Sequence, residues 1–181
     1  MERPSLSMAR AGELFTLLSW IQGQINDLLI FRRHPALVEP FLNNPEVMPA
    51  QFVDLRVAGW QKYFQTVVDE FLATFADQLH EKEIVSLQQL VDFRNIIGHA
   101  HYSLARDYLL YRPNGGEARE AKLIERLGIK PREGATRPAL FKLDLSRDDV
   151  YLAIFNQVVS IDEHCLGRIA TTLGLKHSRI R

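Results

Sequence analysis

Hydrophobic residues recur every three or four positions in four long stretches of the chain, the spacing that places side chains on one face of a helix. The first predicted helix runs from Met8 to Arg33 and ends before Pro35, because a proline disfavours helical backbone at the residue before it. The next two run from Val53 to Leu79 and from Ile84 to Ala105. The last begins near Ser146 with an acidic first turn and continues to Leu173. Its apolar face includes Val158, Ile161, Cys165 and Ile169.

The second stretch has the clearest amphipathic pattern, and we expect it to form one continuous helix that buries its apolar face. The polar residues His80–Glu83 follow it and suit the turn of an antiparallel helix hairpin. The apolar positions at helical spacing in this stretch are Val57, Trp60, Tyr63, Phe64, Val67, Phe71, Phe75 and Leu79.

The segment 106–145, between the third and last helices, follows a different pattern. Tyr108–Tyr111 and Ala139–Leu145 are rich in residues that favour strands, and apolar and polar residues alternate along the second of them. Between them, Glu117–Leu127 forms a short helical stretch that is closed by Gly128. We therefore expect two short strands that pair, with a small helix on their connection.

These patterns predict an all-α fold with a small β-hairpin-like insertion between helices three and four. Four long helices in succession favour an antiparallel four-helix bundle, because each helix then buries one apolar face against the other three. A length of 181 residues is typical of one domain, so we expect a single domain over residues 1–181.

Composition narrows the class of protein further. No apolar run approaches the roughly 18 residues that cross a membrane, and the first residues do not resemble a signal peptide. Cys165 is the one cysteine, so it cannot form an internal disulfide, and it falls on the apolar face of the last helix. We expect a cytoplasmic protein without membrane contact, with Cys165 in its core.

Charge is balanced overall but unevenly distributed. The chain has 22 basic and 22 acidic residues, which argues against a protein that coats nucleic acid through bulk charge. Residues 106–147 carry 10 basic and 6 acidic side chains, whereas residues 1–105 carry 8 basic and 12 acidic ones. The basic segment fits either a solvated, arginine-rich loop or a surface that binds a polyanion.

Candidate chemistry is concentrated near the end of the third predicted helix. Arg94, Asn95, His99 and His101 are not needed for packing there, and burying them unpaired would cost roughly several kcal/mol. On a helix, Asn95 and His99 share one face, whereas Arg94 and His101 share another. Asp92 precedes them and would either be solvated or orient Arg94.

These residue types are sufficient for RNA cleavage without a metal ion. A histidine takes the proton of a ribose 2′-OH, the oxygen attacks the neighbouring phosphorus, and an acid protonates the leaving 5′-oxygen. An arginine holds the phosphate and stabilises its developing charge. The sequence has no glycine-rich phosphate loop, and no carboxylate cluster suited to two metal ions stands out. We therefore expect neither a cofactor nor a metal.

The segment Arg94-Asn95-Ile96-Ile97-Gly98-His99 resembles the Arg-Asn-x-x-x-His motif of the HEPN superfamily (higher eukaryotes and prokaryotes nucleotide-binding domain). His101 also satisfies the looser form of that motif. The resemblance covers roughly residues 8–105 and 146–175. It implies an antiparallel helical bundle that forms a homodimer with two motifs facing each other. It also implies a metal-independent endoribonuclease of toxin–antitoxin, abortive-infection or antiviral-defence systems, with RNA as substrate.

Carried onto this sequence, the resemblance assigns Arg94 to the scissile phosphate, Asn95 to an orienting role and His99 to acid–base chemistry. Family spacing favours His99 as the principal histidine, whereas ideal helix geometry favours His101, which assists or replaces it. The candidates for binding the RNA substrate, which follow the motif closely, are Tyr102, Arg106 and Arg112.

Two other functions stay open at this point. The chain could be a non-catalytic HEPN module that binds RNA, a nucleotide or a partner protein, or a helical scaffold subunit of a larger assembly. If it is a toxin, its partner would be an antitoxin or another defence-system protein. RNA binding without cleavage would distinguish the binding module from the enzyme.

Overall fold

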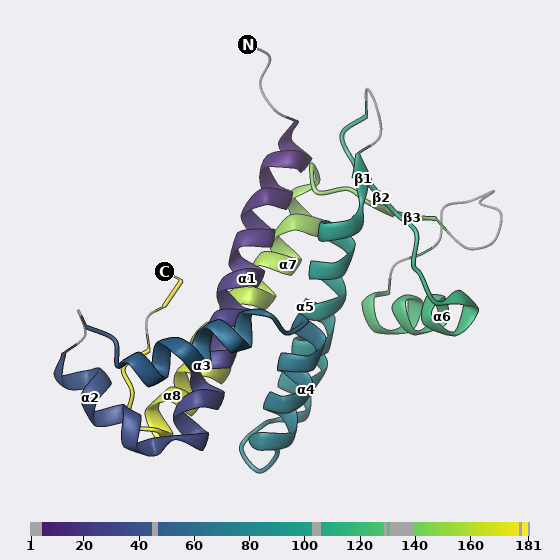
Figure 1. Cartoon of the computed structure of the whole chain (residues 1–181). Coiled ribbons are helices and arrows are strands. Elements are labelled where there is room, and N and C mark those ends of the chain that lie inside the picture. The colour runs from purple at the N-terminus through teal and green to yellow at the C-terminus, as the bar shows by residue number, and fades with distance from the viewer. Residues whose placement is uncertain are drawn as a thin grey trace. The chain divides into compact units, whose positions relative to one another are not determined.

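The computed structural model describes residues 5–44, 47–102, 106–128, 130, 140–177 and 179–180. These residues are mostly helical and include a small three-stranded antiparallel sheet, so the all-α class is confirmed at this coarse level (Figure 1). The chain divides into two compact units, the first with residues 1–16 and 89–157 and the second with residues 17–88 and 158–181. The single domain and the four-helix bundle stay predictions.

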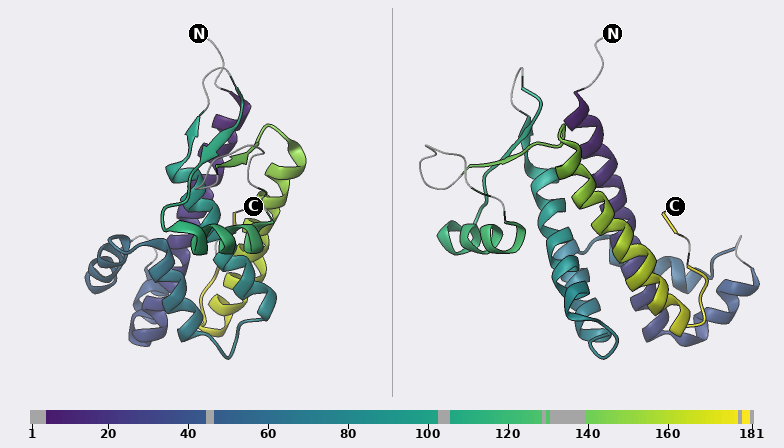
Figure 2. Two further views of the ribbon diagram at one scale, coloured as in Figure 1. Left: turned by 90° about the vertical axis from the view of Figure 1, so that its right-hand side faces the viewer. Right: turned by 180° about the vertical axis from the view of Figure 1, so that it is seen from behind.

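The first unit combines helical segments with the sheet. Its helical segments are residues 6–16 of α1 (Leu6–Arg33), 89–99 of α5 (Glu81–His99), α6 (Gly116–Leu127) and 148–157 of α7 (Asp148–Ser160). Its strands are β1 (His101–Tyr102), β2 (Leu109–Tyr111) and β3 (Phe141–Leu143), in the spatial order β1-β2-β3. Figure 2 shows these strands from two further directions.

β2 is the central strand and pairs antiparallel with both of its neighbours. Side chains alternate along β3 as the sequence predicts, because Phe141 and Leu143 are buried whereas Lys142 is exposed. Leu109 of β2, directly opposite Leu143, is fully buried. The predicted pairing of two short strands is therefore confirmed, although the predicted start of the second strand at Ala139 lies outside the described residues.

The third predicted helix ends earlier than expected. α5 stops at His99, and the helix predicted at His101 and Tyr102 is wrong, because these two residues form β1 and pair with Leu110 and Leu109. The antiparallel ladder takes up backbone groups that a further helical turn would otherwise have to satisfy. Residues 103–105, which we also expected to be helical, lie outside the described residues.

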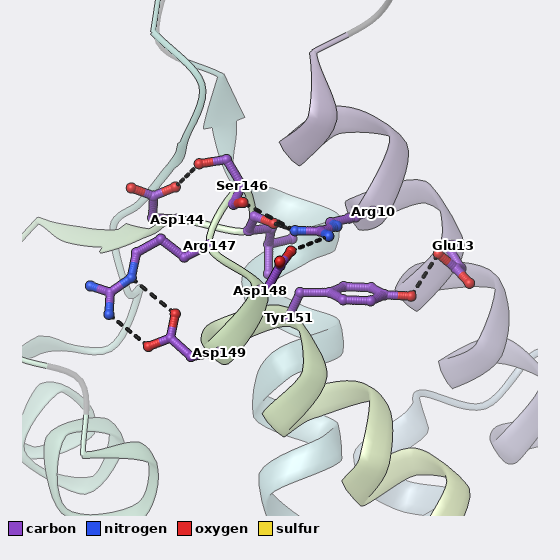
Figure 3. A network of polar contacts seen from close by, with 9 residues as sticks. Arg10, Glu13, Asp144, Ser146, Arg147, Asp148, Asp149 and Tyr151 are labelled. Atoms are coloured by element: carbon purple, nitrogen blue, oxygen red, sulfur yellow. Dashed lines mark hydrogen bonds and ion pairs between the residues drawn. The ribbon is translucent and has the colours of Figure 1, made fainter.

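A polar network ties the start of α1 to the start of α7 within the first unit (Figure 3). Arg10 donates to the backbone carbonyl oxygens of residues 145 and 146 and forms an ion pair with Asp148. Its guanidinium lies 4.5 Å from the ring centroid of Tyr151, whose hydroxyl donates to Glu13. Burial, reinforced by the hydrogen bond to the Glu13 carboxylate, raises the pKa of Tyr151 to about 12. The predicted acidic first turn of α7 thus anchors the N-terminal helix.

The described residues of the second unit form helices joined by turns and loops, without a strand. Its longer segments are residues 17–33 of α1, α3 (Ala50–Trp60) and α4 (Phe64–Thr74). Its shorter segments are η1 (Pro35–Leu37), α2 (Val38–Asn43), residues 81–88 of α5, residues 158–160 of α7, η2 (Ile161–Leu166) and α8 (Gly167–Thr172).

The second predicted helix is broken near its middle, which corrects the expectation of one continuous helix. α3 ends at Trp60, and α4 begins only after Tyr63, whose backbone is extended. Trp60 and Tyr63, which the amphipathic pattern places in the core, are 62% and 83% exposed, and Val57 is exposed as well. The pattern holds only for the second half of the stretch, whose buried residues are Phe64, Val67, Phe71 and Phe75.

The last predicted helix keeps its apolar face although it changes its winding. The six residues of η2 form a π-helix between α7 and α8. Val158, Ile161, Cys165 and Ile169, which lie on the predicted apolar face, are all buried. Burial raises the pKa of the Cys165 thiol to about 12, which keeps it protonated at neutral pH and fits the predicted packing role.

Gly59 lies against Asn26 of α1 so closely that a Cβ atom at position 59 would overlap the Asn26 side-chain amide. Asn26 is buried, so it has little room to move aside. We expect Gly59→Ala to lower the free energy of unfolding by about 1–3 kcal/mol, the usual cost of overpacking. Thermal denaturation followed by circular dichroism measures this change.

Gly23→Ala is the matched control, because Gly23 lies inside α1 and no heavy atom lies within 4 Å of the place its Cβ would take. Alanine at this position is expected to raise the stability by about 0.5–1 kcal/mol, the helix preference of alanine over glycine. Equal stability of the two variants would contradict the close approach of Gly59 to Asn26.

Candidate active site

A pocket of about 370 Å³ lies in the first unit, where α5 ends and the sheet begins. His99, the last residue of α5, and His101, the first residue of β1, line one part of it. Tyr111 at the end of β2 and the following residues Arg112 and Asn114 line the other. Two predicted histidines and one predicted arginine therefore share a single pocket.

The sheet register explains why these residues meet. In the antiparallel pairing of β1 with β2, His101 lies opposite Leu110. The residues that precede His101 therefore leave the sheet at the same end as the residues that follow Leu110. His99 belongs to the first group and Arg112 to the second. The pairing of β1 with β2 therefore brings these two residues to the same pocket, although they are far apart in the sequence.

The structure also shows which predicted residues lie elsewhere. Arg94, Asn95, Tyr102 and Arg106 do not line the pocket. Tyr102 is 39% exposed in β1, where burial of part of the ring and the nearby charge of Asp107 raise the pKa of its hydroxyl. The helix-face argument for His101 is wrong, because His101 lies in a strand; both histidines are nevertheless exposed and line the pocket.

Arg106 has a local partner and lies on the surface. Its Nη1 donates to the Tyr108 hydroxyl at 2.9 Å, and this hydrogen bond raises the pKa of the guanidinium. Arg112 differs, because within the described residues its side chain makes neither a hydrogen bond nor an ion pair. Arg112 therefore brings to the pocket a positive charge that no carboxylate among the described residues pairs with.

Arg94 is held by packing rather than by a carboxylate. Its guanidinium lies 5.4 Å from the ring centroid of Phe15 in α1. Its Nε atom is buried and has no hydrogen-bond partner among the residues described. Gly98, one turn further along α5, makes room for the same ring, because a Cβ there would approach Phe15 to 3.3 Å. The charge of Arg94 is thus positioned in α5 without being neutralised.

Asp92 is neither solvated nor directed at Arg94, so both predictions that the sequence suggested for this residue are wrong. Its side chain is 5% exposed and accepts a hydrogen bond of 2.7 Å from Arg126 of α6, with Arg119 at 3.9 Å. Burial raises the pKa of this carboxyl, and the two arginines oppose that shift. Gln89 of α5 also donates to the backbone oxygen of Arg126 at 2.6 Å. These contacts fasten α6 to α5.

The sequence reasoning missed Asn114 as a pocket residue. The sequence signal that marks it is the Asn114-Gly115-Gly116 turn within the segment 106–145. Gly115 and Gly116 have φ values of 117° and 74°, which favour glycine, and this turn leads directly into α6. The Asp92–Arg126 contact at the other end of α6 and this turn together fix the pocket wall.

A larger pocket of about 850 Å³ lies in the second unit and contains none of the candidate catalytic or RNA-binding residues predicted from the sequence. It is lined mainly by polar side chains, including Arg168, which donates to both carboxylate oxygens of Glu83. His177 lies on the same wall and shares a hydrogen bond of 3.0 Å with Asp162 of η2. Arg168 and His177 of this pocket therefore each have a carboxylate partner.

Within the described part of the chain, no three His, Cys, Asp or Glu side chains gather in a way that would hold a metal ion. None of the helices that the structure describes is both long and apolar enough to span a membrane. Comparison with known proteins finds no match to a family model, to a curated protein or to a solved structure.

Proposed function

We propose that this protein is a HEPN-type endoribonuclease that cleaves RNA without a metal ion, by attack of a ribose 2′-OH on the adjacent phosphorus. The observation that carries the proposal is the pocket of the first unit, which combines His99 and His101 with the guanidinium of Arg112. Two groups that exchange protons near neutral pH and a cation that binds phosphate are the chemistry that this reaction requires.

The residues divide the reaction between them. One histidine, with His99 as the principal candidate, takes the proton from the 2′-OH while the oxygen forms a bond to phosphorus. The other, as imidazolium, gives a proton to the 5′-oxygen as its bond to phosphorus breaks. Arg112 stabilises the charge that develops on the phosphoryl oxygens. The motif resemblance assigns phosphate binding also to Arg94 and an orienting role to Asn95, although neither lines the pocket. The products are a 2′,3′-cyclic phosphate and a 5′-hydroxyl.

The biological setting in this proposal follows from the motif resemblance. The chain acts as a toxin or antiviral-defence effector, regulated by an antitoxin or another partner protein. It works as a homodimer of antiparallel four-helix bundles, in which the two copies of residues 94–99 face each other. Tyr102 and Arg106, which lie outside the pocket, contact the RNA beyond the scissile bond.

The test is cleavage of a single-stranded RNA in the presence of EDTA, with analysis of the product ends. We expect cleavage to persist in EDTA and to yield cyclic phosphate and 5′-hydroxyl ends. The matched control is the same oligonucleotide with 2′-O-methyl groups, which should remain intact because it lacks the attacking hydroxyl. Cleavage of that control, or a requirement for added divalent cation, would overturn the proposed mechanism.

A further inference from the structure

A second pocket of the second unit, of about 250 Å³, has the character of a small-molecule site. Its apolar wall is formed by Trp20 and Phe31 of α1, Phe41 of α2 and Met48 before α3. This volume lies below the roughly 300–1,000 Å³ of sites that hold drug-sized ligands, so the pocket suits one planar ring system.

Two charged side chains face each other in the same pocket. Arg56 of α3 and Asp27 of α1 line it, and their Nη2 and Oδ2 atoms lie 3.1 Å apart. The two side chains are only 25% and 17% exposed, so this is a largely buried ion pair. Burial raises the pKa of Asp27 to about 6 in spite of the Arg56 charge, as is common for carboxyls in binding sites.

The ion pair leaves two strong hydrogen-bonding atoms unused. Asp27 Oδ1 and Arg56 Nε are both buried, and neither has a hydrogen-bond partner among the described residues. Each such atom costs about 1–3 kcal/mol when it is left unsatisfied, so an unsatisfied acceptor beside an unsatisfied donor calls for a partner. Arg56 also donates to the Met48 sulfur, at 3.7 Å, and its guanidinium lies 5.9 Å from the ring centroids of Phe52 and Trp60.

We infer that this pocket binds a planar heteroaromatic base whose edge carries an N–H donor beside an acceptor, as purine bases do. The N–H donates to Asp27 Oδ1, and the acceptor receives a hydrogen bond from Arg56 Nε. The ring lies against the aromatic wall and stacks on Trp20, which is 39% exposed, because Phe31 and Phe41 already pack on Phe52. The site is independent of the proposed ribonuclease pocket, which lies in the first unit and shares none of these residues.

The fluorescence of Trp20 provides a direct test. The chain has two tryptophans, and the exposed Trp60 does not line the pocket, so a Trp60→Phe protein reports on Trp20 alone. The probes are adenosine and inosine, which carry a neighbouring donor and acceptor, and purine riboside, which keeps the acceptor without that donor. We expect saturable quenching by adenosine or inosine, with purine riboside binding at least tenfold more weakly.

A double variant, Asp27→Leu with Arg56→Met, distinguishes loss of the site from loss of the fold. Replacing both members of a buried ion pair by apolar residues is often neutral for stability, whereas removing one leaves an unpaired charge. We expect the double variant to melt cooperatively and to lose at least tenfold in nucleoside affinity. Equal quenching by all three probes, or unchanged affinity in the folded double variant, would overturn the inference.

A further titration shows whether the bound base belongs to an RNA strand or to a free nucleoside. A short single-stranded RNA that contains the preferred base is compared with the free nucleoside in the same titration. Tighter binding of the oligonucleotide assigns the pocket to a base within RNA, and tighter binding of the nucleoside assigns it to a free metabolite. Either result supports the recognition chemistry, and binding of neither contradicts it.

Discussion

Replacing His99 with alanine is expected to lower the rate of RNA cleavage by about 10²–10⁴-fold, the usual contribution of a positioned general acid or base. His99 lies at the end of α5 and lines the candidate pocket together with Arg112. His101 lines the same pocket from β1, so His101→Ala is expected to lose activity too, by at least tenfold. Single-turnover cleavage of a labelled RNA in EDTA measures both losses without interference from product release.

The control for this prediction is another exposed histidine, His164, which lies in the second unit. His164→Ala is expected to cleave at the wild-type rate. If His99→Ala, His101→Ala and His164→Ala all cleave equally, the activity comes from a site elsewhere or from a contaminating nuclease. A loss confined to His101→Ala would make His101 the principal histidine and leave His99 as a residue of the pocket wall.

Variants of Arg112 and Arg94 are tested in the same cleavage assay. Arg112→Ala removes a cation from the pocket, and Arg94→Ala removes the guanidinium that packs on Phe15. Both variants are expected to slow cleavage, and Arg112→Lys is expected to restore part of the rate, because lysine keeps the charge but not the planar fork. Full activity in Arg94→Ala would contradict its role in holding the phosphate.

The sequence predicts best what depends on local geometry. The apolar periodicity of the last helix correctly identifies Val158, Ile161, Cys165 and Ile169 as buried, since neighbouring turns of one helix set that spacing. The alternation in Phe141–Leu143 likewise predicts a strand with one buried face. These features need no knowledge of which other segment covers the apolar side.

The predictions from the sequence are wrong where contacts with a distant segment of the chain determine the structure. Trp60 and Tyr63 continue the apolar pattern of Phe64–Phe75, yet they are exposed, because the helix ends where Gly59 approaches Asn26. An apolar residue at helical spacing shows which face it occupies but not whether anything covers that face. The contact between Gly59 and Asn26 leaves no trace in the local pattern.

The candidate site also combines features that the sequence predicts with features that depend on distant contacts. The residue types and their spacing make Arg94, His99 and His101 candidates, but they do not predict the strand that carries His101. A two-residue strand is too short to show any periodicity, and its pairing with β2 is what places Arg112 beside the histidines. Asp92 is a second case, since its buried contact with Arg126 depends on where α6 returns to α5.

Asp92→Ala is expected to lower the free energy of unfolding by about 2–4 kcal/mol, because it leaves a guanidinium beside a vacated, largely buried position. The Asp92 side chain is 5% exposed, whereas Arg126 and Arg119 are 28% and 43% exposed. Because both arginines are partly solvated, we expect the loss of stability to be smaller than for a fully buried ion pair. Asp92→Asn is the matched variant, since its amide oxygen still accepts from Arg126. It is expected to retain most of the stability.

We expect the loss of stability in Asp92→Ala to be concentrated in α6. Hydrogen exchange of residues 116–127 is expected to accelerate in Asp92→Ala, and RNA cleavage to fall several-fold, because α6 begins two residues after Asn114 at the pocket wall. The alternative is that the apolar contacts of Leu123, the buried residue of α6, hold this helix by themselves. Unchanged exchange in α6 of Asp92→Ala would establish that alternative and separate the ion pair from the geometry of the pocket.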